Sequence, residues 1–214
     1  MTPLGPGYGE TPLDGDELAA LHPDARAVLP DPPTKADVYD LEQAFQTAVT
    51  EDLVGAVLDG AIGVADVVAD VVADHFLRSL HARLYGDIWT WGGKLRRREI
   101  NIGVAPEQIA MELRGSLDGI LYRWQHTSDW TAHQLGIAVH AETVRIHPFT
   151  DGNGRSTRLL ADLTGLAAQG ADEPPAIYDW DVEKQQYIEA LRRYDTHRDP
   201  AESASIITSR SIGE

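Results

Sequence analysis

The chain contains no cysteine, only three lysines and no long apolar run. The absence of cysteine excludes disulfide bonds and thiolate metal sites. No stretch reaches the ~18 apolar residues that span a bilayer, and the N-terminus lacks a basic segment followed by an apolar run. These absences favour a soluble chain in a reducing compartment, and we expect it to be cytoplasmic.

Basic residues are scarce, with 18 lysines and arginines against 34 acidic residues and a formal net charge of −16. A surface of this kind repels a phosphate backbone, so we expect no direct contact with nucleic acid. The length of 214 residues and the 43% share of apolar residues are enough for one domain with a sizeable core and an appendage.

The strongest chemical signal is residues 147–158, which read His-Pro-Phe-Thr-Asp-Gly-Asn-Gly-Arg-Ser-Thr-Arg. This segment combines an imidazole, a carboxylate, a glycine-flanked amide and two arginines. A glycine-rich turn that opens a helix presents backbone N–H groups and the positive end of the helix dipole, which together bind anions such as phosphate. Arg155 and Arg158 are three residues apart, so both lie on one face of the following helix, near its N-terminus.

The residues from Thr131 to Ile146 predict a buried helix in front of this loop, with Thr131 and Gln134 as a capping box. Pro148 disfavours the helical conformation for His147, so we expect this histidine at the end of the helix with its ring facing the loop. A general base would be placed there.

A second helix is predicted after the loop, because four leucines recur at helical spacing: Leu159, Leu160, Leu163 and Leu166. Asp162 follows Arg158 by four residues, so we expect its carboxylate to lie near enough to orient the guanidinium. The whole unit is therefore predicted to be helix, anion loop, helix.

The pattern His-Pro-Phe, two residues, Gly-Asn-Gly-Arg, two residues, Arg resembles the signature of the Fic domain family, the Fic/Doc protein adenylyltransferases, at every position. Upstream segments resemble the approach to the Fic β-hairpin flap and the strand that returns from it: 76–77, 80–81, 84–86, 89–94 and 101–104. The nearest resemblance is to the subgroup called mobile mystery protein B, which is usually encoded beside a helix-turn-helix protein; it extends to residues 11–14 and 40–43. The resemblance implies a mainly α, Fic (Fido) helical fold with a β-hairpin flap.

The resemblance also implies the chemistry: transfer of AMP from ATP to a hydroxyl side chain of a target protein. His147 would take the proton from that hydroxyl, as suits a group that titrates near neutral pH. Asp151 would hold the Mg²⁺ that bridges the α- and β-phosphates. The implied nucleotide-binding residues are Gly152, Asn153, Gly154, Arg155 and Arg158. Phe149 is interpreted as an anchor of the loop in the core, and His81 as an ordinary core histidine.

A dense basic cluster lies in the segment that resembles the flap: Lys94, Arg96, Arg97 and Arg98. A solvated charged hairpin is one interpretation. The other, which the resemblance implies, is that the flap near Lys94–Ile102 adds a strand to an extended segment of the target protein, whose acidic residues the cluster would favour. A helix-turn-helix protein is the second expected partner.

The chain divides by composition into four parts. Residues 1–33 hold seven of the twelve prolines, and we expect an extended N-terminal arm without regular helix or sheet. Residues 34–74 form an N-terminal helical segment, with one helix over 35–50 and a Val-Val-Ala-Asp repeat over 64–74 that we interpret as a solvated face. Residues 75–200 form the Fic domain, with a closing helix that ends near His197. Residues 201–214 are a C-terminal tail without a recognisable motif.

Two other functions stay open on the sequence. One is another Fic-type reaction, either phosphate transfer or removal of AMP, although Gly-Asn-Gly-Arg favours AMP transfer because phosphorylating relatives depart from it. The other is a non-catalytic, toxin–antitoxin-like interaction module, which would be expected to lose His147, Asp151 or a motif arginine. The chain retains all of these.

Many Fic proteins are restrained by a helix bearing Ser or Thr, three residues, Glu, then Gly or Asn, whose glutamate pairs with the second motif arginine. The only near match here runs from Thr47 to Asp52, with Asp52 in place of Gly or Asn. We interpret Glu51 as an ordinary surface glutamate that does not pair with Arg158. Restraint, if there is any, is then expected from a separate protein such as the helix-turn-helix partner.

Overall fold

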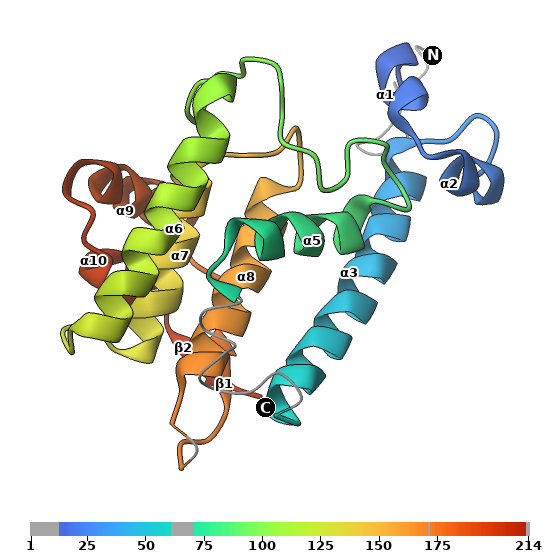
Figure 1. Ribbon diagram of the computed structural model, residues 1–214. Helices are drawn as coiled ribbons and strands as arrows, with labels where there is room; N and C mark the ends of the chain where they lie inside the picture. Colours follow the sequence, from blue (N-terminus) through green and yellow to red (C-terminus); the bar gives the residue numbers. More distant parts are fainter. Residues whose placement is uncertain (1–12, 61–70, 171, 213–214) are drawn as a thin grey trace, which may run out of the picture.

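The computed structural model describes residues 13–60, 71–170 and 172–212; the first part of the N-terminal arm and most of the Val-Val-Ala-Asp repeat lie outside the described residues. The described chain is mainly helical, as predicted. Its body consists of α3 (Lys35–Leu58), α5 (Asp74–Tyr85), α6 (Ile109–His126), α7 (Ala132–Ile146) and α8 (Asn153–Ala168). Figure 1 shows α6 and α7 on one side and α3 on the other, with α5 and α8 between them. None of the described helices is both long and apolar enough to cross a bilayer.

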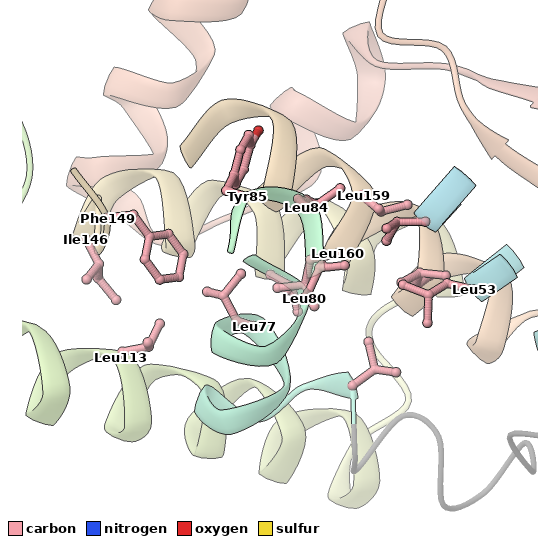
Figure 2. Packing of buried hydrophobic residues seen from close by; sticks show 14 of the residues in the cluster. Leu53, Leu77, Leu80, Leu84, Tyr85, Leu113, Ile146, Phe149, Leu159 and Leu160 are labelled. Carbon is pink, nitrogen blue, oxygen red and sulfur yellow. The ribbon is translucent and has the colours of Figure 1, made fainter. Parts of the chain in front are cut away.

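Helices α7 and α8 form the centre of the molecule and carry most of its core. The predicted capping box is confirmed at the start of α7, where the Thr131 side chain accepts from the Gln134 N–H and the Gln134 side chain accepts from the Thr131 N–H. Leucines of α5 meet Leu160 of α8, with Phe149 at one end of the cluster and Leu53 of α3 at the other (Figure 2). This packing holds the two ends of the motif loop on a rigid base.

The expectation of an arm without regular structure is wrong for its described part, which contains α1 (Gly15–Ala20) and α2 (Pro23–Val28). Asp14 and Glu17 form a capping box at the start of α1, and Pro23 occupies the first turn of α2, where a missing N–H costs nothing. The prolines therefore mark helix boundaries here. The segment is tied to the body through the His22 N–H, which donates to the Ile88 carbonyl at 2.7 Å.

The prediction of a β-hairpin flap is also wrong for the described residues, because no strand occurs among them between Trp91 and Val104. Two backbone donors of this segment bond to the end of α7 and to the motif loop: the Val104 N–H donates to the Ile146 carbonyl at 3.2 Å and the Arg96 N–H to the Pro148 carbonyl at 2.9 Å. A hairpin would need those groups for its own ladder. We call residues 91–104 the flap loop below.

The C-terminal residues form the only sheet within the described ranges, in which β1 (Ala176–Tyr178) pairs antiparallel with β2 (Ser209–Ser211). The predicted closing helix is α9 (Lys184–His197), and α10 (Ala201–Ile206) follows it within the expected tail. Tyr178 joins this layer to α7, because its hydroxyl donates to the His133 carbonyl at 2.7 Å. These elements cover the face of α7 and α8 on which Arg158 lies.

Candidate active site

His147 ends α7, as predicted, and has a left-handed backbone conformation with φ 52° and ψ 64°. Such a conformation is uncommon for a residue with a side chain, and at functional sites it is maintained by the surrounding structure. The ring is partly buried, and Nδ1 has no hydrogen-bond partner among the described residues. Burial, aided by the nearby charge of Arg96, lowers the pKa of His147. The neutral ring that a general base needs is therefore favoured at neutral pH.

This pKa shift leads to a titration prediction. We expect the His147 ring of the free protein to protonate at a lower pH than an unperturbed histidine, whose pKa is 6.5, since burial disfavours the charged form. Proton NMR of the ring resonances across the histidine titration range measures this directly, with His147→Gln to assign the signal. A His147 pKa at or above 6.5 would contradict the prediction.

Phe149 and Asn153 fasten the motif loop to the core. Phe149 is fully buried, as predicted, and its ring stacks on His81 with centroids 3.6 Å apart. The Asn153 side chain accepts from the Phe149 N–H and donates to the Phe149 carbonyl, both at 2.9 Å. Both polar atoms of the Asn153 side chain are used within the loop, so any part that Asn153 takes in anion binding falls to its backbone. Only its backbone N–H faces the helix terminus.

The two hydrogen bonds between the Asn153 side chain and the Phe149 backbone predict that truncation of Asn153 destabilises the protein. Asn153→Ala leaves the buried N–H and carbonyl of Phe149 without partners, so we expect the free energy of unfolding to fall by about 1–2 kcal/mol. Urea denaturation measures the change, and Asn101→Ala, at an exposed asparagine of the flap loop, is the matched control. Equal effects of the two substitutions would show that the clamp contributes nothing.

Gly152 opens α8 with φ 72°, and a Cβ at this position would lie 2.5 Å from the ring of Tyr85. Only glycine fits both requirements. The first N–H groups of α8, at Asn153, Gly154 and Arg155, have no carbonyl within the helix to bond to. Together with the helix dipole these groups suit an anion, and the predicted anion site stays a prediction.

Asp151 precedes this anion site, with an exposed side chain whose Oδ1 accepts from the Gly152 N–H at 2.7 Å. No group of three or more His, Asp or Glu side chains suited to a metal ion occurs among the described residues. Mg²⁺ in nucleotide sites is typically held by one or two carboxylates together with substrate phosphates, so a single exposed carboxylate at a phosphate site fits that ion.

His81 is a core histidine with partners for both ring nitrogens, as interpreted, and those partners connect two functional segments. It is fully buried; its Nδ1 accepts from the Gly93 N–H at 2.9 Å and its Nε2 contacts the Asp151 carbonyl at 3.0 Å. Burial lowers its pKa to about 4, so the ring is neutral and donates from Nε2 to Asp151. His81 thus joins the flap loop to the residue proposed as the metal ligand.

Arg155 is held by a glutamate that the sequence reading did not single out. Its Nη1 donates to Glu42 Oε2, and its guanidinium lies over the ring of Tyr85, 5.0 Å from the centroid. Glu42 is only 6% exposed, and its Oε1 accepts from Trp89 Nε1 at 2.7 Å. A glutamate on the buried face of α3, four residues after the buried Val38, was the signal available in the sequence.

Arg158 lies between two aromatic rings, 5.6 Å from the centroid of Trp180 and 5.5 Å from that of Tyr187. Direct orientation by Asp162 is corrected, since no ion pair joins the two residues in the described chain; Asp162 instead accepts from the Tyr178 N–H at 3.0 Å and from Trp180 Nε1 at 3.2 Å. Burial raises the pKa of Asp162 to about 6. The charge of Arg158 acts in the opposite direction on this pKa, so Asp162 lies near Arg158 without forming an ion pair with it.

Glu51 is exposed on α3, and no ion pair between Glu51 and Arg158 occurs among the described residues. Its neighbour Asp52 pairs with Arg83 at 2.6 Å. The interpretation of Glu51 as an ordinary surface residue is therefore confirmed by the structure.

A cleft of about 2,100 Å³ leads to the motif between α3 and the flap loop. It reaches the motif at Thr150, Asp151 and Arg155, and Glu42 also lines it. The basic residues Lys94, Arg97 and Arg98 line its flap side. The cleft therefore joins Asp151 and Arg155 to the basic part of the flap loop.

Residues 72–164 match the model of the Fic/DOC family. This segment of the chain therefore resembles a Fic domain. Protein adenylyltransferase Fic of Drosophila melanogaster is 33% identical over 117 residues, which cover 50% of this chain and 21% of that protein. Protein adenylyltransferase fic-1 of Caenorhabditis elegans is 28% identical over 123 residues, which cover 55% of this chain and 23% of that protein. The chain thus matches less than a quarter of the length of these curated relatives.

Solved structures of Fic domains agree with this resemblance in fold. A Fic-1 fragment from Caenorhabditis elegans superposes with a TM-score of 0.56 and 20% identity over 77% of this chain and 47% of that one. A Fic-domain signalling protein from Bacteroides thetaiotaomicron superposes with a TM-score of 0.55 and 19% identity, over 78% of this chain and 63% of that one. A Bartonella quintana Fic domain with bound ADP superposes with a TM-score of 0.50 and 16% identity, over 70% of this chain and 84% of that one. The resemblance to the mobile mystery protein B subgroup stays a prediction.

Proposed function

We propose that this chain is a protein adenylyltransferase that moves AMP from ATP, with Mg²⁺, to a hydroxyl side chain of a target protein. The observation that carries the proposal is the arrangement of the motif: a neutral His147 at the end of α7, four residues before Asp151, while Asp151 and Arg155, at the start of α8, line one cleft. The names of the curated relatives and the ADP bound to one neighbour of the same fold support the same chemistry.

The proposed transfer needs one bond formed and one broken. His147 accepts the proton of the target hydroxyl while that oxygen attacks the α-phosphorus of ATP. The bond between the α-phosphorus and the bridging oxygen breaks, and pyrophosphate leaves with its electron pair. The first N–H groups of α8, with Arg155 and Arg158, bind the β- and γ-phosphates and stabilise the charge of the leaving group.

Asp151 is the residue that would hold Mg²⁺. When bound, the ion neutralises phosphate charge and aligns the phosphates for displacement. His81, which donates to the Asp151 carbonyl, keeps this part of the loop in place, and the exposed carboxylate faces the cleft.

The proposed partners follow from the surface of the cleft. We place the target protein on the flap loop near Lys94–Ile102, where Arg97 and Arg98 are exposed and the side chain of Ile102 is 52% exposed. The cationic rim favours an acidic target segment. A helix-turn-helix protein, acting with this chain in a toxin–antitoxin-like pair in the cytoplasm, is the proposed regulator.

The intact mass of the chain and of candidate targets after incubation with ATP and Mg²⁺ tests the proposal. We expect addition of one adenylyl group, whereas a gain of one phosphate would indicate the phosphotransfer alternative. Absence of ATP binding in calorimetry would favour the interaction module. Asp151→Ala should greatly weaken the Mg²⁺ dependence of both binding and transfer, and unchanged dependence would refute the metal assignment.

A further inference from the structure

Arg96 belongs to the basic cluster of the flap loop, but unlike its neighbours it is buried, with 3% of its surface exposed. Arg97 and Arg98 are exposed. The Arg96 guanidinium donates to three backbone carbonyls: that of His147 from Nε at 2.8 Å, that of Arg98 from Nη1 at 3.1 Å, and that of Val104 from Nη2. No carboxylate pairs with it in the described residues. The Arg96 side chain therefore fixes the position of the backbone around it and does not contribute to the charge of the surface.

These contacts supply hydrogen-bond donors to the carbonyls at the end of α7. The last carbonyls of a helix have no partner within the helix, and cationic side chains near a C-terminus can satisfy them. Here three consecutive carbonyls are satisfied from the flap loop: Ile146 by the Val104 N–H, His147 by the Arg96 side chain, and Pro148 by the Arg96 N–H. The left-handed turn at His147 is therefore held from outside its own helix.

The flap loop also approaches His147 closely at Gly103. Gly103 has φ 87°, and a Cβ there would lie 2.6 Å from His147 Cβ and 2.8 Å from Arg96 Nη2. The flap loop thus passes directly against the proposed base, and only glycine allows this approach. Movement of the loop and movement of His147 are linked by hard contacts as well as by hydrogen bonds.

We propose that Arg96 is a positioning residue that fixes His147 in its left-handed conformation and couples the geometry of the proposed base to the flap loop. The proposal rests on the assignment of His147 as the base in adenylyl transfer. A target segment that occupies the exposed side of the flap loop then acts on the base through Arg96. Arg96 itself is not available to bind the target, so the target-facing charge of the cluster belongs to Lys94, Arg97 and Arg98.

The test compares Arg96→Gln with Arg96→Lys and with Arg192→Gln, a control at an exposed arginine of α9 outside the flap loop. Misplacement of a reacting group by about 1 Å can cost about 10²-fold in rate, so we expect Arg96→Gln to lower kcat for AMP transfer by about 100-fold. The Kd for ATP should stay within threefold, because the phosphate groups bind on α8. Arg96→Lys, which keeps the charge and part of the donor set, should fall between Arg96→Gln and the wild type.

A second measurement needs no activity. The Cα and carbonyl chemical shifts of His147 report its backbone conformation, and we expect the left-handed signature to be lost in Arg96→Gln and kept in Arg192→Gln. If the wild-type chain transfers no AMP, the proposed function fails, while the chemical shifts still decide whether Arg96 holds His147. Should Arg96→Gln not fold, Gly103→Ala disturbs the same contact from the loop and should show the same separation of kcat from Kd. A kcat within threefold of wild type, or unchanged His147 shifts, in a folded variant would overturn the proposal.

Discussion

His147→Ala is expected to lower the rate of AMP transfer by about 10²–10⁴-fold, the usual contribution of a positioned general base. The affinity for ATP should change little, because His147 ends α7 while the phosphate-binding groups lie at the start of α8. Radiolabel transfer from ATP labelled at the α-phosphate measures the first quantity, and calorimetry measures the second. The two results together separate catalysis from binding.

A matched control is His126→Ala, which removes an exposed histidine near the end of α6. It should leave both quantities unchanged. Transfer within threefold of the wild-type rate in His147→Ala would remove His147 from the role of base, and a parallel loss of ATP affinity would mean that the ring supports the loop and not the chemistry.

Local features of the fold were predictable because their causes lie within a few residues of one another. The capping box at Thr131, the end of α7 at the residue before Pro148, and the start of α8 after the glycine of the motif each depend on spacing and backbone preference. The burial of Phe149 also followed, since an aromatic residue within a polar loop has few other uses.

The roles of Arg96 and Asn153 were not predictable from local pattern. Four basic residues within five positions suggest a solvated hairpin, yet Arg96 faces the carbonyls at the end of α7, about fifty positions away along the chain. Asn153 lies in a motif that binds anions, yet its side chain serves the loop itself. In both cases the decisive partners are backbone groups, which leave no trace in the side-chain sequence.

The N-terminal helices were missed for a related reason. Prolines disfavour helix interiors but are well tolerated at first positions, and Pro23 stands at such a position. Composition alone therefore predicted an extended arm where the order of residues allows short helices. The contact between this segment and the body, from His22 to Ile88, depends on tertiary structure.

Glu42→Gln is expected to strengthen ATP binding by about 30-fold. In the structure Glu42 forms an ion pair with Arg155, the first motif arginine. Both residues line the cleft together with Asp151. A phosphate that binds Arg155 must displace or share this carboxylate. A hydrogen bond to a charged group contributes about 1.5–3 kcal/mol, and about 2 kcal/mol corresponds to this change in affinity.

Glutamine is the informative substitution because it removes the negative charge while keeping an oxygen for the Trp89 indole N–H, which donates to Glu42 at 2.7 Å. Glu51→Gln, on the exposed face of the same helix, is the control and should change nothing. Calorimetry with ATP and Mg²⁺ measures the affinities, and thermal unfolding shows whether the variants remain folded.

The double variant Glu42→Gln with Arg155→Gln tests where the gain comes from. If Glu42 competes with phosphate for Arg155, the gain in affinity disappears once Arg155 is removed, and the two effects are strongly non-additive. A gain that survives in the double variant would point to a general electrostatic effect on the cleft. Weaker ATP binding in Glu42→Gln alone would instead mean that the carboxylate holds Arg155 ready for the nucleotide. The expected result would place an internal restraint at the first motif arginine of the isolated chain. It would then correct the expectation that restraint comes only from a separate protein, and the proposed helix-turn-helix partner would act in addition to it.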